Sequence, residues 1–220
     1  MKLFENLYWY EYKGFKNNCN TILIKNDSHL LIDPGHIFNF ENLFQEIKRD
    51  GIDSKEIIAI LNTHCHPDHC ESNEILQKIS RGKIGMHEIE YDYYKNDARL
   101  LYEMFNIPFQ DSKVDFYLKD SIEHNGLKLE IIHTPGHSPG SVCFYWRKQR
   151  VLISGDLIFE NSFGRSDLPG GNPSLLQTSV KNISNLDIEL LLPGHGKMVN
   201  GKKNIQKNFD FINRILKNYP

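Results

Sequence analysis

The chain has 220 residues, of which 40% are hydrophobic and 25% are charged, as in an ordinary folded protein and unlike disordered or collagen-like chains. The 26 Lys and Arg residues against 28 Asp and Glu give a formal net charge of -2, so there is no overall positive field to hold a nucleic acid. No apolar run has the length that a bilayer-spanning helix needs. We therefore expect a small-molecule substrate, and neither a nucleic acid nor a membrane as partner.

The cysteines and the first residues indicate the compartment. Four cysteines are few for this length, and they lack the spacing of a disulfide framework, which is typical of a reducing environment. Residues 1–15 interleave charged and aromatic side chains and contain no apolar run of the kind found in a signal sequence. We expect reduced thiols, a cytoplasmic protein and a single domain over residues 1–220, because neither a linker nor a repeat divides the chain.

In the first half of the chain, strands are joined by turns and then by helices. Two apolar runs, 20–25 and 29–33, flank the turn pair Asn26-Asp27 and predict a hairpin. Apolar residues at helical spacing follow in 40–49. Residues 57–61 form an apolar run without alternation, as in a strand covered on both faces. Three further elements are expected: a helix over about 71–79, a strand over 84–87, and a helical or irregular stretch through Tyr102 and Phe105.

The second half repeats this scheme. Residues 122–124 and 127–133 flank Asn125-Gly126, the strongest short signal for a hairpin, and 142–146 with 151–154 predict another hairpin. Two series of strands, each followed by helices, indicate two sheets packed on each other with helices outside. The remaining elements expected are a helix over 173–183, a buried strand over 189–192 and an amphipathic helix over 204–216.

Three histidines and an aspartate lie within six positions, in the run HCHPDH at residues 64–69. Imidazole nitrogen suits zinc, iron, copper or nickel, and a neighbouring carboxylate adds compensating charge. Pro67 is expected to exclude a regular helix from this turn. The cluster therefore indicates a transition-metal site.

Three further motifs place a histidine or an aspartate in a turn after an apolar strand. Residues 134–140 read TPGHSPG around His137, Asp156 follows the strand expected at 151–154, and residues 193–196 read PGHG around His195. A single such residue is more often a turn or cap residue than a ligand. Four such loops in one chain indicate a shared site.

In this order, HCHPDH, TPGHSPGS, SGD and LPGHG resemble the metallo-β-lactamase superfamily over nearly the whole chain. The resemblance implies an α+β fold, an αβ/βα four-layer sandwich of two mixed sheets flanked by helices, with the site in a groove at one edge of the sheets. It also implies two transition-metal ions, zinc first, with iron or manganese as alternatives. One ion would be bound by His64, His66 and His137 and the other by Asp68, His69 and His195, and Asp156 would bridge both.

Residues 164–171, GRSDLPGG, resemble the glyoxalase II-like branch, the hydroxyacylglutathione hydrolases and their close relatives. Arg165 is expected either to contact the substrate or to pair with Asp167 and brace its loop. Full-length glyoxalase II continues beyond the PGHG turn into a helical region that helps to hold glutathione, whereas only residues 197–220 follow here. We therefore expect weaker selectivity for glutathione.

The resemblance implies hydrolysis of a small thioester by metal-bound hydroxide, with Asp68 and Asp156 as catalytic residues that orient the hydroxide. A persulfide dioxygenase with one iron is an alternative, because that subgroup is similar in the same segment, and a lactonase is another, because lactonases share the TPGHSPG loop. A nuclease is disfavoured, since no basic stripe is visible. Metal identity, the natural substrate and the oligomeric state stay open.

Residues beside the motifs have supporting roles. Asp33, at the end of the strand expected at 29–33, is expected to accept a hydrogen bond from a ligand imidazole. Cys65 and Cys70 are expected to be small buried side chains and not ligands. His133 lies just before the TPGH loop and is expected to support the ligands from behind.

Overall fold

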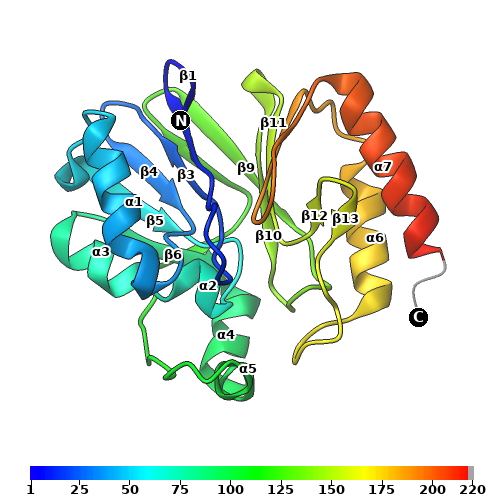
Figure 1. Ribbon diagram of the computed structural model, residues 1–220, viewed down its shortest axis with the longest axis horizontal. Helices are drawn as coiled ribbons and strands as arrows, with labels where there is room; N and C mark the ends of the chain where they lie inside the picture. Colours follow the sequence, from blue (N-terminus) through cyan, green and yellow to red (C-terminus); the bar gives the residue numbers. More distant parts are fainter. Residues whose placement is uncertain (218–220) are drawn as a thin grey trace.

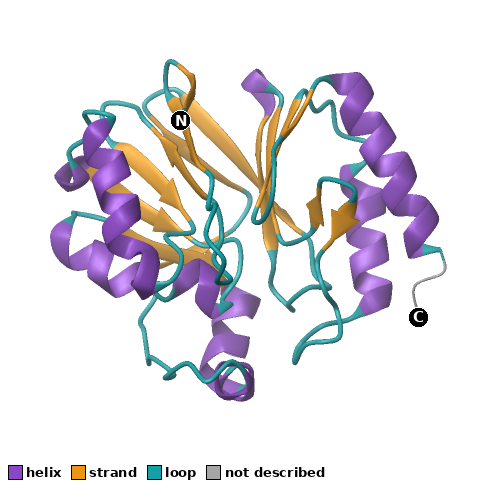
Figure 2. Ribbon diagram, in the orientation of Figure 1, coloured by secondary structure: helices purple, strands orange, loops and turns teal. Residues whose placement is uncertain are grey.

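Two β-sheets pack face to face, and helices cover their outer surfaces, in the computed structural model (Figure 1), in which residues 1–217 are described. Figure 2 shows the strands gathered in the middle of the molecule, with the helices on the flanks. The expected α+β class and the αβ/βα arrangement are confirmed.

The first sheet is mixed, in the order β1-β2-β3-β4-β5-β6-β7. Its first four strands are antiparallel, and β4 to β7 run parallel to one another. Parallel neighbours end at the same edge, so the segments that leave β4 and β5 lie close together. The strands are β1 Lys2–Phe4, β2 Leu7–Tyr10, β3 Thr21–Ile24, β4 His29–Ile32, β5 Ile57–Leu61, β6 Lys83–His87 and β7 Phe116–Leu118.

The second sheet has the order β15-β14-β11-β10-β9-β8 and is antiparallel except for the parallel pair of β11 and β14. A separate small hairpin is formed by β12 and β13. The strands are β8 Ser121–His124, β9 Leu127–His133, β10 Val142–Trp146, β11 Val151–Gly155, β12 Ile158–Phe159, β13 Ser162–Phe163, β14 Leu190–Pro193 and β15 Val199–Asn200.

The main hydrophobic core lies between the sheets. Trp9, Ile22 and Ile32 of the first sheet pack in one buried cluster with Phe144 and Ile153 of the second. Removing this apolar surface from water is the principal stabilising contribution to the sandwich.

Each outer face has a core of its own. Leu43 and Ile47 of α1 pack with strands of the first sheet. Val180 of α6 and Phe209 of α7 pack on the second sheet with Leu191. The helices are α1 Ile37–Arg49, α2 Pro67–Cys70, α3 Asn73–Ile79, α4 Glu88–Asn96, α5 Arg99–Met104, α6 Pro173–Ile183 and α7 Lys202–Leu216. Among residues 1–217, no helix combines the length and the apolarity needed to cross a bilayer.

The three expected hairpins, the strands at β5, β6 and β14 and the helices α1, α3, α6 and α7 are confirmed, with bounds that differ by a few residues. The expectation for Pro67 is wrong, because the short helix α2 begins there with proline in its first turn. The amide N–H that proline lacks has no partner within the helix at that position, so proline is tolerated. Strands β1, β2 and β7 and the hairpin of β12 and β13 were not predicted.

Candidate metal centre

The ends of strands from both sheets, rather than any one helix, position the candidate ligands. The chain leaves β5 at Leu61 and runs through residues 62–66 into α2, which carries Asp68 and His69. His137 lies in the connection from β9 to β10. Asp156 follows β11 and His195 follows β14, and because these two strands are parallel, both side chains emerge at the same edge.

All seven side chains proposed from the sequence meet at this edge. Their ligand atoms form three overlapping groups, and within each group the atoms lie within 4.8 Å of one another. His64 and His69 each belong to two of the groups, so the groups form one continuous cluster. The groups are His64 with His66 and His137, His64 with His69 and Asp156, and Asp68 with His69 and His195.

Asp156 lies between the two sets of side chains. Its Oδ1 is 3.2 Å from Nε2 of His69, and its Oδ2 is 3.5 Å from Nε2 of His137 and 3.4 Å from Nε2 of His195. His195 in turn lies 3.1 Å from Oδ2 of Asp68. A single carboxylate therefore faces histidines from both proposed coordination groups.

The residues fit a transition metal. The Nε2 atoms of His64, His66 and His137 are buried and have no hydrogen-bond partner among the described residues. A buried polar atom without a partner is costly, so three of them facing one point need a common partner. Imidazole nitrogen with carboxylate oxygen is a donor set that suits zinc, iron or manganese, and a cation at this point satisfies all three rings.

In the metal-free chain, the histidines of the cluster differ in the direction in which their pKa values are shifted. Burial, followed by the nearby histidines, holds the pKa values of His64 and His66 well below the ordinary range. Burial also lowers the pKa of His195, but the charge of Asp156 and the hydrogen bonds that His195 donates to Asp156 and Asp68 outweigh it and raise that pKa to about 10. The lowered pKa values of His64 and His66 favour the neutral rings that metal ligation requires, whereas the raised pKa of His195 means that a metal must displace a proton there.

Asp33 orients His69. The Nδ1 atom of His69 donates to Oδ2 of Asp33 at 2.9 Å, which directs Nε2 of the same ring into the cluster. Thr63 donates to the same carboxylate from its backbone N–H at 2.8 Å and from its hydroxyl at 2.6 Å. The predicted role of Asp33 as an acceptor for a ligand imidazole is confirmed.

His137 is oriented by a backbone carbonyl. Its Nδ1 atom donates to the carbonyl oxygen of Arg165 at 2.6 Å. The Arg165 guanidinium pairs with Asp167 through contacts of 2.9 and 2.8 Å, and both side chains are largely exposed. The ion pair considered from the sequence is therefore present, and substrate contact by Arg165 stays a prediction.

Glu90 of α4 joins two of the ligand loops, and sequence reasoning missed it. The carboxylate is fully buried, and its Oε1 accepts the backbone N–H of Cys65 at 2.8 Å, between His64 and His66. Its Oε2 accepts the Ser138 hydroxyl at 2.8 Å and the Gly140 N–H at 2.7 Å, beside His137. In the sequence, Glu90 is indistinguishable from an ordinary acidic residue in the first turn of a helix.

The other residues singled out from the sequence, His133, Cys65 and Cys70, are not part of the cluster of ligand atoms. His133 stacks on His87 with ring centroids 4.5 Å apart, and its Nε2 lies 3.0 Å from the Pro139 carbonyl oxygen, so it supports the loop backbone. Cys65 and Cys70 are buried, as expected, and burial raises the pKa of both thiols.

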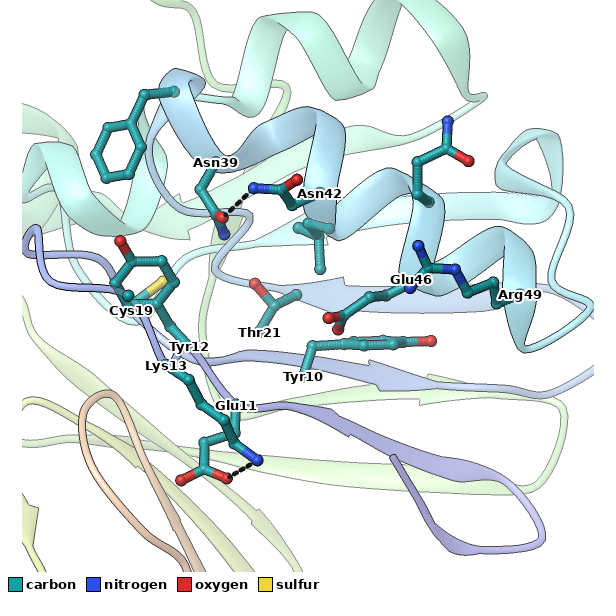
Figure 3. Close-up of a pocket in the computed structure, with 14 residues that line it drawn as sticks. Tyr10, Glu11, Tyr12, Lys13, Cys19, Thr21, Asn39, Asn42, Glu46 and Arg49 are labelled. Atoms are coloured by element: carbon teal, nitrogen blue, oxygen red, sulfur yellow. Dashed lines mark hydrogen bonds and ion pairs between the residues drawn. The ribbon is translucent and has the colours of Figure 1, made fainter.

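Two hollows share Phe38 in their linings. One, of about 470 Å³, separates the segment Tyr10 to Gly14 from α1, and Figure 3 shows Asn39, Asn42 and Glu46 of α1 across from it. None of the seven clustered side chains lines this hollow. The other, of about 580 Å³, is lined in part by Asp68 and therefore adjoins the cluster.

Comparison with known proteins places the chain among metal-dependent enzymes. Residues 14–195 match the family described as the metallo-beta-lactamase superfamily. A probable metallo-hydrolase of Methanocaldococcus jannaschii is 33% identical over 84% of this chain and 91% of its own length. The hydroxyacylglutathione hydrolase GloC of Haemophilus influenzae is 28% identical over 83% of this chain and 87% of its own length.

Two solved structures support the same relationship. The B3 metallo-beta-lactamase BLEG-1 superposes with a TM-score of 0.80 at 29% identity and covers 96% of this chain and 99% of its own. The protein TTHA1623, solved in a di-iron-bound form, superposes with a TM-score of 0.70 at 31% identity and covers 83% of this chain and 89% of its own.

Proposed function

Because the chain belongs to the metallo-beta-lactamase superfamily, we propose that it is a dinuclear metal-dependent hydrolase whose substrate is a small thioester. The observation that carries this proposal is the position of Asp156, which groups with His64 of one proposed set of ligands and with His69 of the other. A mononuclear site has no need of a carboxylate that faces both sets.

In this proposal, His64, His66 and His137 hold one ion, Asp68, His69 and His195 hold the other, and Asp156 contacts both. Zinc is the first candidate, with iron or manganese as alternatives. The similar protein TTHA1623 was solved in a di-iron-bound form, which supports iron as an alternative. When bound, two such ions lower the pKa of a shared water towards about 7 and polarise a carbonyl oxygen.

The chain itself supplies orientation and charge. Asp68 and Asp156 are the acceptors that hold and direct the attacking water, and Asn17 donates to Oδ2 of Asp68 at 2.7 Å, which fixes that carboxylate. Cys19 and Cys143 are fully buried with raised pKa values, caused first by desolvation, so they are poor nucleophiles. Attack by water is therefore favoured over a covalent acyl-enzyme.

The choice of a thioester rests on two supports. The likeness to GloC, a hydroxyacylglutathione hydrolase, extends over most of both chains. The segment GRSDLPGG, whose Arg165 carbonyl orients His137, resembles the thioester-hydrolase branch.

A paired assay tests the proposal. Zinc-loaded protein is given lactoylglutathione and simpler thioesters while free thiol is followed, and iron-loaded protein is given glutathione persulfide while oxygen uptake is followed. We expect thiol release in the first arm and its loss in an Asp156→Asn variant. Persulfide-dependent oxygen uptake without thioester cleavage under either metal would replace the hydrolase with a dioxygenase.

A further inference from the structure

A groove of about 580 Å³ adjoins the candidate metal centre at Asp68. At one end it is lined by Asp68 and Asn17, which are joined by the hydrogen bond of 2.7 Å between Asn17 Nδ2 and Asp68 Oδ2. If the reacting carbonyl of a substrate lies at the metal centre, one of the groups attached to that carbonyl can therefore extend into this groove.

The walls of the groove are apolar and come from two distant segments. Ile37 and Phe38 begin α1, whereas Phe105 and Ile107 follow α5. The side chains of Ile37, Phe38 and Phe105 are 40%, 47% and 46% exposed. Large apolar side chains exposed side by side next to a polar site are typical of a surface that binds a ligand.

One wall is held in place without a ligand. Oε2 of Glu71 accepts a hydrogen bond from Nδ1 of His36 at 2.7 Å and another from the Ile37 backbone N–H at 3.1 Å. The His36 ring also stacks on Phe38, with ring centroids 5.2 Å apart. Since these contacts fix the start of α1, binding an apolar group there requires little reordering.

Lys16 adds a positive charge to the lining. Its Nζ lies 5.3 Å from the centroid of the Phe38 ring, above the apolar wall. Within residues 1–217, no carboxylate forms an ion pair with Lys16, and Glu71, which also lines the groove, is engaged by His36. The charge is thus available to an anionic group on a ligand.

We infer that this groove receives an apolar arm of the substrate and that Lys16 meets an anionic group on that arm. The inference rests on the proposed function, and it narrows the substrate class to thioesters with an extended apolar arm that carries a negative charge. Thioesters with a very short acyl group leave the groove empty and are the poorer substrates.

Kinetics with matched thioesters tests the apolar wall. S-acetyl and S-hexanoyl derivatives of one small thiol are compared in the wild type, in Phe105→Ser and in the control Met104→Ser, whose side chain is 57% exposed and lies outside the groove. We expect Phe105→Ser to lower kcat/KM for the hexanoyl compound about tenfold and to leave the acetyl compound unchanged. Equal losses for both compounds, or the same loss in Met104→Ser, would overturn the inference.

Binding of simple carboxylic acids tests the groove independently of any catalytic activity. Calorimetry with metal-loaded protein compares acetate, hexanoate and adipate, and we expect adipate to bind most tightly and acetate least. Lys16→Gln should remove the advantage of adipate over hexanoate, and Phe105→Ser the advantage of hexanoate over acetate. If these binding results are found but no thioester is cleaved, the inference about the groove is supported and the proposed thioesterase activity is refuted. If thioesters are cleaved but all three acids bind equally, only the inference about the groove is refuted.

Discussion

Gly140 lies so close to Glu90 that a Cβ atom on the glycine would be 2.2 Å from the backbone nitrogen of Glu90. This approach allows the Gly140 N–H to reach Oε2 of Glu90 at 2.7 Å. The loop that carries His137 therefore rests directly on α4, the helix that also receives the N–H of Cys65 through the same carboxylate.

Glu90→Gln should selectively lower the affinity for the ion proposed to bind to His64, His66 and His137. The amide keeps one acceptor oxygen, but its NH₂ group must then face a backbone N–H or the Ser138 hydroxyl, so one of the two loops loses its acceptor. We expect metal content to fall from two ions to one, as measured by elemental analysis. Glu88→Gln on the exposed face of α4 is the control, and two retained ions in Glu90→Gln would contradict this role.

Asp156→Asn should reduce activity more than any other single change of a carboxylate. Its two oxygens face His69 on one side and His137 and His195 on the other, so the substitution removes charge from both proposed ions. We expect a loss of at least about 100-fold in kcat/KM together with a lower metal content. Asp187→Asn, which changes an exposed ion pair with Lys202, is the control. Two ions per chain in Asp156→Asn would exclude a bridging role.

Asp33→Asn should weaken metal binding about 10- to 100-fold without unfolding the chain. Asp33 has a φ of +54°, which asparagine tolerates, so the backbone is preserved. The Asp33 carboxylate accepts hydrogen bonds from His69 and from Thr63, and an amide in its place accepts fewer. Competition with a chromogenic chelator measures the change, and an unaltered metal affinity would show that His69 needs no partner.

Metal binding near neutral pH should release protons. In the metal-free chain the pKa of His195 is raised to about 10, so the ring is protonated there and must lose its proton to become a ligand. A raised pKa stabilises the folded metal-free chain at low pH, and this contribution disappears as the pH rises through about 10. Calorimetry in two buffers with different heats of ionisation measures the release, and identical heats would contradict the prediction.

Removing the metal should lower the melting temperature. Ions at 100 times their dissociation constant stabilise the folded state by about 2.7 kcal/mol. For a chain of this size that corresponds to a shift of roughly 5 to 10 °C. Thermal unfolding with and without a chelator, followed by restoration with zinc, measures the effect. A melting temperature that the chelator leaves unchanged would show that the cluster holds no ion in the purified protein.

The parts of the site that sequence reasoning found are those whose chemistry is local. Residues 64–69 carry three histidines and an aspartate in one turn, and Asp33 was found because it resembles the acid that the superfamily carries at the end of this strand. Pro67 was misjudged because the same residue that breaks a helix interior also begins a helix well.

The parts that were missed depend on tertiary packing. Glu90 contacts Cys65 and Gly140, which are 25 and 50 positions away, and no spacing rule connects them. The walls of the groove come from the start of α1 and the segment after α5, so only the folded chain brings them together. Strand β2 was missed although all four of its residues are buried, because charged residues on both sides of this short run obscure it in the sequence.

The candidate ligands come from both sheets: His64, His66, Asp68 and His69 follow a strand of the first, and His137, Asp156 and His195 follow strands of the second. Neither half of the sandwich can assemble either ion site alone, because His137 completes one group and His195 the other. A complete ion site therefore requires the two sheets to be docked, and an ion bound there would join the two halves of the sandwich. A substitution that shifts one sheet against the other would therefore be expected to weaken metal binding, even where it lies far from the ligands.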